Sequence, residues 1–138
     1  MKPNKSLDEI IDLMRVKQEK AYSLRNSQAI DEIEELAIEL AAINFSLSYY
    51  QVYYEDEFNI LEQLYKHECA ATFMEEKSNK KTDGASDNIA KVKHSSIKQD
   101  SIANYTMYQY AKTYHNDVKV LIDTLRGRAS TLKKERTQ

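Results

Sequence analysis

The hydrophobic positions of the chain repeat with the spacing of α-helices over most of its length. The first stretch opens with a capping box, Ser6-Leu7-Asp8-Glu9, whose serine and glutamate side chains can satisfy backbone N–H groups at a helix start. The apolar face that follows contains Leu7, Ile10, Ile11 and Met14. We therefore predict a short first helix over residues 6–26.

A second, much longer helix is predicted over residues 28–77, a stretch without Gly or Pro. Its main apolar row has a spacing of seven residues and consists of Ile33, Leu40, Leu47, Tyr54 and Leu61. Further apolar residues lie off this row, namely Ile38, Ala41, Phe45, Tyr49 and Tyr53. Because one partner helix would leave much of this surface in water, we expect self-association. The expected oligomer interface is Ile33, Leu36, Leu40, Ile43, Leu47, Tyr54, Phe58 and Leu61.

The polar stretch 78–87 contains Gly84 and predicts a loop rich in lysine. Asp87 or Ser86 can cap a third helix over residues 88–132, whose apolar positions include Ile97, Met107, Ala111, Tyr114, Val118, Leu121 and Leu125. Two long helices joined by such a loop run antiparallel. The predicted fold is therefore all-α: one helical domain over residues 1–138, with a short N-terminal helix and a long, coiled-coil-like antiparallel hairpin that oligomerises.

The composition supports this fold and narrows the function. Hydrophobic residues make up 41% and charged residues 30% of the 138 residues, with 2 Gly and 1 Pro, which is typical of helical chains. No apolar run approaches the roughly 20 residues that a membrane span needs, so we expect a soluble, cytoplasmic protein, located in the host cell if phage-encoded. The single Cys69 excludes an internal disulfide, and none of the three His has a second ligand at helical spacing. We expect no cofactor, no metal and no enzymatic activity.

Charge is distributed unevenly along the chain. Residues 1–75 contain 7 Lys and Arg against 15 Asp and Glu, whereas residues 76–138 contain 13 against 7. The basic residues of the second part form either a solvated face or a phosphate-binding surface. The ten tyrosines allow a similar pair of interpretations, because they can pack between helices or stack on the bases of a single strand.

A series of segments in the second part points to one family. They are Leu64-Tyr65-Lys66-His67-Glu68, Phe73-Met74 ahead of the Gly84 loop, Ala90-Lys91-Val92-Lys93, the pair Tyr105 and Tyr108, and Val118-x-x-Leu121-x-x-x-Leu125-Arg126-x-Arg128. Their order and spacing over residues 60–136 resemble the recombination mediators of T-even-type phages, the UvsY family. The resemblance implies binding of single-stranded DNA, rings of helical subunits, and loading of a RecA-like recombinase onto strands covered by single-strand binding protein.

The resemblance also suggests which residues contact DNA. The family's Leu-Lys-Ala-Arg type motif is nearest to Leu64, Lys66 and His67, with the lysine displaced by one position and His67 in place of arginine. This departure shifts the expected contacts towards the later lysines. The predicted nucleic-acid-binding residues are Lys66, His67, Lys77, Lys80, Lys81, Lys91, Lys93, Lys98, Arg126 and Arg128.

Two functions follow from the sequence. The first is a phage-type recombination accessory protein that binds single strands non-specifically and helps to load a recombinase. The alternative is a protein-binding helical adaptor, scaffold or inhibitor without a nucleic-acid ligand, in which the heptad surface is the whole function. A structural coiled-coil subunit with no ligand is a third, weaker option.

Overall fold

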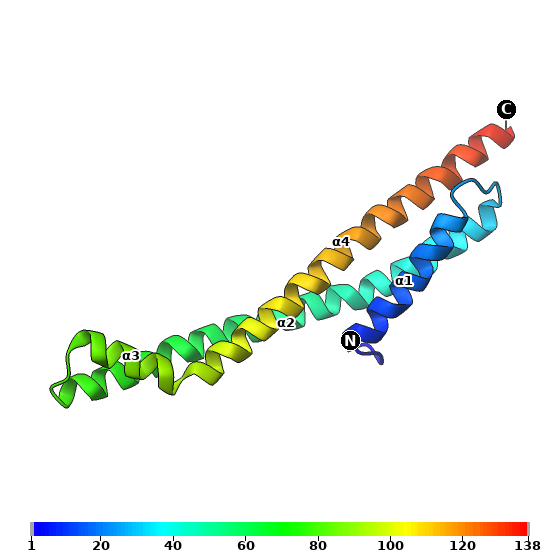
Figure 1. Ribbon diagram of the computed structural model, residues 1–138. Helices are drawn as coiled ribbons and strands as arrows, with labels where there is room; N and C mark the ends of the chain where they lie inside the picture. Colours follow the sequence, from blue (N-terminus) through cyan, green and yellow to red (C-terminus); the bar gives the residue numbers. More distant parts are fainter. Residues whose placement is uncertain (1, 138) are drawn as a thin grey trace. The chain divides into compact units, whose positions relative to one another are not determined.

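The computed structural model describes residues 2–137, which form four α-helices and no strand. The helices are α1 (Leu7–Ser23), α2 (Ile30–Ser78), α3 (Asp83–Lys93) and α4 (Ser95–Thr137) (Figure 1). The all-α prediction is confirmed. The described residues divide into two compact units, the first containing residues 2–51 and 109–137 and the second residues 52–108. Both α2 and α4 contribute one part to each unit.

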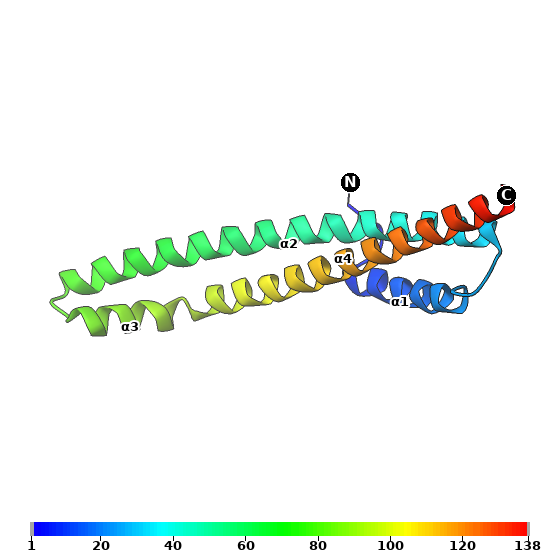
Figure 2. The same ribbon diagram turned by 90° about the horizontal axis from the view of Figure 1, so that it is seen from above.

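The first unit is a three-helix bundle. In both views, α1 lies beside the N-terminal part of α2 and the C-terminal part of α4 (Figures 1 and 2). Its buried apolar residues come from all three helices and include Leu7, Ile10, Ile11 and Met14 of α1, Ile33, Leu36, Leu40, Ile43 and Leu47 of α2, and Val118, Ile122, Leu125, Ala129 and Leu132 of α4. These rows have helical spacing, so each helix buries one continuous apolar stripe in the bundle.

Polar contacts cap the start of α1 and join α1 to α2. The predicted cap is present, because the Ser6 hydroxyl oxygen accepts a hydrogen bond from the Glu9 backbone N–H at 3.2 Å. The hydroxyl of the buried Tyr50 donates to the Lys5 carbonyl oxygen at 2.5 Å, and burial raises the pKa of this tyrosine. The Lys17 ammonium pairs with Glu39 at 2.6 Å and holds the pKa of that carboxyl below its usual value.

The uneven charge of the sequence is largely neutralised inside the first unit. The basic end of α4 lies against the acidic start of α2, where Lys133 forms an ion pair with Glu34. Two guanidinium groups donate to backbone carbonyls ahead of α2: Arg128 to Ser27 at 3.2 Å and Arg136 to Gln28 at 2.6 Å. With 13 Lys and Arg against 12 Asp and Glu, this unit has a net charge of +1. Antiparallel packing thus brings the acidic and basic parts of the sequence together.

The second unit is an antiparallel hairpin with a shorter connection than the sequence predicts. The loop expected over residues 78–87 is a turn over residues 79–82, in which Lys80 has a positive φ of 63°. The Thr82 hydroxyl oxygen accepts from the Ala85 N–H at 3.2 Å, so it is Thr82 that caps the third helical segment. The expected caps, Ser86 and Asp87, lie inside α3, and the helix starts at Asp83 because Thr82 satisfies its open N–H group first.

The third helical segment is also interrupted once. His94 separates α3 from α4 with φ −108° and ψ 18°, and its ring Nε2 lies 2.7 Å from the Thr72 hydroxyl of α2. After this break α4 continues through Gly127 to Thr137, beyond the predicted end at residue 132. The interruption leaves both pieces of the segment packed against α2 within the hairpin.

The hairpin packs through small and polar side chains. Its buried residues are Thr72, Ser86, Ala90 and Ser101. The Glu62 carboxylate accepts hydrogen bonds from the Ser101 hydroxyl at 2.5 Å and from the Lys98 ammonium at 2.9 Å, which together lower its pKa. Among the tyrosines, Tyr105 packs on Phe58 with ring centroids 5.0 Å apart. Packing therefore accounts for at least this part of the tyrosine group.

Candidate protein-binding surface

Five of the eight residues expected to form an oligomer interface are buried within the first unit. Ile33, Leu36, Leu40, Ile43 and Leu47 are buried against the other helices of the first unit. In the second unit, Tyr54, Phe58 and Leu61 are half-buried on α2. The heptad row of α2 is thus used for intramolecular packing in the first unit, whereas its continuation in the second unit keeps part of its surface exposed. Self-association itself stays a prediction.

An outward-facing apolar row lies on the opposite side of α2 in the first unit. Ile38 and Phe45, seven residues apart, retain 69% and 72% of their accessible surface. Ala42, between them on the same face, is also exposed. Single exposed apolar residues are ordinary, but residues spaced at i, i+4 and i+7 form a continuous stripe on one helix face. Ile38 and Phe45 are the large apolar residues that α2 leaves exposed in the first unit.

A groove between α2 and α4 runs along the edge of this stripe. One section has a volume of about 450 Å³ and is lined by Ala41, Asn44, Phe45, Ser48, His115, Lys119, Ile122, Asp123 and Arg126. A second section of about 330 Å³ is lined by Glu34, Ala37, Ile38, Arg126, Ala129, Ser130 and Lys133. Arg126 lines both sections, so they adjoin. Five of the fifteen lining residues are Ala or Ser, and the buried lining residues are Ala37, Ile122 and Ala129. We call these two sections together the α2–α4 groove.

The α4 edge of the groove carries basic residues at a spacing of seven. Lys112, Lys119, Arg126 and Lys133 follow this spacing, which places them on one face of α4. Lys133 is paired with Glu34. Lys119 and Arg126 have no ion pair or hydrogen bond among the described residues, and neither has Asp123, which lies between them. Two unpaired cations and one carboxylate therefore give this edge a positive charge.

Most of the predicted nucleic-acid-binding lysines of the hairpin are neutralised by carboxylates. Lys77 pairs with Asp83 at 2.7 Å and Lys81 with Glu76 at 2.6 Å. Along the helices, Lys91 pairs with Asp87 at 3.0 Å, which raises the pKa of the lysine, and Lys98 pairs with Glu62 at 2.9 Å. In the first unit, Arg128 donates to the Ser27 carbonyl and Arg126 lines the groove. The predicted nucleic-acid-binding residues therefore lie partly in the hairpin and partly in the first unit.

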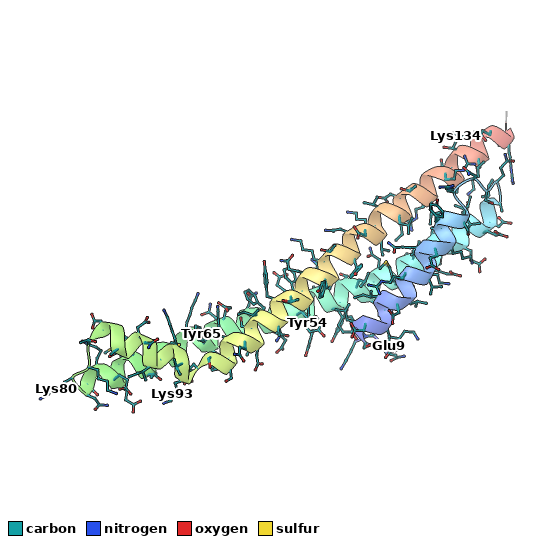
Figure 3. The ribbon with its side chains drawn as sticks, in the orientation of Figure 1. Glu9, Tyr54, Tyr65, Lys80, Lys93 and Lys134 are labelled. Carbon is teal, nitrogen blue, oxygen red and sulfur yellow. The ribbon has the colours of Figure 1, made fainter. Side chains whose placement is uncertain are left out.

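Lys66, His67, Lys80 and Lys93 are exposed members of that set in the second unit, and within residues 2–137 none of the four has an ion-pair partner. Figure 3 shows Lys80 at the turn after α2 and Lys93 near the end of α3. The second unit as a whole contains 7 Lys and no Arg against 10 Asp and Glu, a net charge of −3. A unit with this balance attracts phosphates only where its few unpaired lysines lie.

No family model matches the chain, and no curated protein or solved structure matches it either. In the described part of the chain, no group of three or more His, Cys, Asp or Glu could hold a metal ion, and no helix has the length and apolarity that crossing a bilayer requires.

Sequence reasoning placed Ile38 and Phe45 off the main heptad row, but it did not predict that they stay exposed while that row is buried within the chain. It also missed Lys112, Lys119 and Lys133 as members of one basic row. The signal that could have found this row is its seven-residue spacing, which matches the spacing of Ile38 and Phe45 on α2. Only the packing of α2 against α4 shows that the apolar row of α2 and the basic row of α4 border one groove.

Proposed function

We propose that the chain is a helical protein-binding module, an adaptor, scaffold or inhibitor whose ligand is another protein. The observation that supports this proposal is the exposed stripe of Ile38, Ala42 and Phe45 beside the α2–α4 groove. The apolar residues that stabilise the bundle are already buried on the opposite face of α2. The outer stripe therefore contributes little to the fold, and it supplies the apolar contact that helix-in-groove recognition uses.

The paired lysines favour the same proposal. Among the predicted phosphate-binding residues, Lys77, Lys81, Lys91 and Lys98 already have carboxylate partners, and a phosphate would have to compete with each of these. Non-specific binding of nucleic acid depends on many such contacts acting together. Binding of a protein through one apolar stripe does not require any of these lysines to be released.

Site-specific photo-crosslinking in cells tests the proposal. A photoreactive amino acid at position 45, or at position 60 in the second unit, is expected to yield discrete protein adducts, because Phe45 and Ile60 are exposed apolar residues of α2. The matched control is position 124, where the exposed Thr124 lies on α4 outside the groove. Protein adducts absent from positions 45 and 60, or equally frequent at position 124, would refute the proposed function.

Binding of single-stranded DNA is the second candidate, and the exposed, unpaired Lys66, Lys80 and Lys93 favour it. In this proposal the chain assembles into a ring, repeats these lysines around it and loads a recombinase, as the likeness to the UvsY family implies. Repeated weak sites on one strand gain from effective concentration.

The test is binding of a fluorescent poly-dT oligonucleotide as a function of salt. The second candidate predicts an affinity that falls steeply as salt rises, and that weakens in the variant K80A/K81A/K91A/K93A at unchanged helicity. Light scattering on the same sample measures whether the chain is oligomeric. Absence of binding at about 50 mM salt would exclude this candidate.

A further inference from the structure

We infer that the α2–α4 groove binds an amphipathic helix of a partner protein that carries acidic residues along its flank. This inference rests on the proposed function and adds the chemistry of the partner. It follows from three features of the groove: an apolar edge, a floor of small residues and a basic edge.

The apolar edge has the spacing of a coiled-coil seam. Ile38 and Phe45 are seven residues apart on α2, which separates them by about 10 Å along the helix axis at 1.5 Å per residue. A helix that lies along α2 meets both of them with apolar residues that also repeat every seven positions. On α2 the groove is lined from Glu34 to Ser48, a length of about 21 Å, so a helix of about two heptads spans it.

The floor of the groove allows a helix to approach closely. It is lined by Ala37, Ala41, Ser48, Ala129 and Ser130, whose side chains extend no more than one heavy atom beyond Cβ, and the larger Ile122 among them is buried. The Asn44 side-chain oxygen lies in the same floor, is shielded from solvent and has no hydrogen-bond partner within the described residues. This buried acceptor favours a partner helix that places one hydrogen-bond donor opposite Asn44. Such a hydrogen bond would fix the register of the partner helix along α2.

The basic edge determines the charge of the partner. Lys119 and Arg126 repeat every seven residues on α4, as Ile38 and Phe45 do on α2. Charged residues beside a coiled-coil seam select partners by sign, so acidic residues at a spacing of seven are attracted and basic ones repelled. Asp123 offsets part of the positive charge, but the edge keeps two unpaired cations against this one carboxylate.

Two other occupants fit less well. A second copy related by two-fold symmetry would bring this basic edge to the interface twice, with Asp123 as the one unpaired carboxylate that each edge offers against Lys119 and Arg126. A single strand of nucleic acid could stack a base on Phe45, but Ile38 offers no aromatic face, and the paired Lys133 is already neutralised by Glu34. An acidic helix uses both edges and the floor.

The test uses two synthetic three-heptad peptides with Leu at positions a and d, one with Glu and the other with Lys at positions e and g. Fluorescence anisotropy measures their binding to the full chain. The Glu peptide is expected to bind and the Lys peptide not to bind. In the double variant Lys119→Glu with Arg126→Glu, the Glu peptide should bind about tenfold more weakly and the preference should reverse towards the Lys peptide.

Two further variants complete the design. Phe45→Glu should abolish binding of the Glu peptide while the circular dichroism spectrum is unchanged, because Phe45 is exposed. The control variant Lys20→Glu with Lys134→Glu makes the same change in net charge at exposed positions of the first unit that do not line the groove, and it should bind as the natural chain does.

Several outcomes would overturn the inference. They are failure of the Glu peptide to bind, an equal effect of the control variant, a dimer in sedimentation that Phe45→Glu dissociates, and displacement of the Glu peptide by poly-dT. The dimer would assign the groove to a second copy, and the displacement would assign it to nucleic acid. If the peptide fails while position 45 still yields protein crosslinks, the acidic partner is wrong and the protein-binding module stands.

Discussion

Truncating a side chain of the inner apolar row of α2 should destabilise the chain far more than truncating one of the outer stripe. Leu40 lies on the inner row and has no accessible surface, whereas Phe45 lies on the outer stripe and keeps 72% of its surface exposed. We compare Leu40→Ala with Phe45→Ala, a pair that removes apolar side chains from the same helix within the same unit. The first change should destabilise the chain strongly, and the second should leave it nearly as stable as before.

The exposed fractions give the size of each effect. Leu40→Ala removes a fully buried side chain and should cost about 2–5 kcal/mol, because it loses transfer free energy and leaves a cavity. Full burial of a Phe side chain contributes about 3 kcal/mol at most. Since Phe45 has lost only about a quarter of its surface, its truncation should cost about 0.8 kcal/mol or less. The difference between the two variants is then about 1–4 kcal/mol.

Urea unfolding followed by circular dichroism measures both variants. The structure predicts that the loss in Leu40→Ala is independent of protein concentration, because the contacts of Leu40 are intramolecular. Equal losses in the two variants would contradict the assignment of inner and outer rows. A loss in Leu40→Ala that varies with protein concentration would instead place Leu40 between chains, as the sequence alone suggested.

Three further substitutions test individual residues of α2, α4 and the cap of α3. Thr82→Ala removes the cap of α3 and should cost about 0.5–2 kcal/mol, measured as faster hydrogen exchange in α3. Gly127→Ala should stabilise the chain by about 1 kcal/mol in thermal unfolding, because this α4 position has room for a methyl group. The Glu62 pKa lies below its ordinary 4.5, so this carboxylate stabilises the fold above that pH and the stabilisation is lost as pH falls through the folded pKa. In the variant Glu62→Gln, hydrogen exchange in the hairpin, measured while the pH is lowered, should no longer show this loss of stability.

The helices themselves were predictable because local chemistry determines them. Ser6 caps α1 as expected, and the absence of Gly and Pro in the second stretch yields one helix, Ile30–Ser78, close to the predicted 28–77. The loop after α2 was predicted too long, because Ser, Asp and Gly are frequent both in loops and in the first turn of a helix. The polar residues that follow Thr82 form the start of α3, and they are helical because Thr82 caps them.

The candidate site was only partly predictable because heptad spacing identifies residues that share a face without identifying what covers the face. Ile33, Leu40 and Leu47 fit a partner chain as well as they fit α1 and α4. The lysines present the same difficulty. The carboxylates that neutralise Lys77 and Lys98 come from Asp83 and Glu62, six residues away and 36 residues away, and no spacing rule connects these pairs.

Three rows of residues, each with a spacing of seven, explain why a binding site is better sought in the first unit than at the lysine-rich turn of the second. The inner row of α2, from Ile33 to Leu47, is fully covered by α1 and α4, so it stabilises the bundle and is unavailable to a ligand. The outer stripe and the basic row of α4 are not needed for that burial. A surface that is both continuous and dispensable for folding can be altered without unfolding the chain. Variants of Phe45, Lys119 and Arg126 should therefore separate binding from stability, whereas variants of Leu40 cannot.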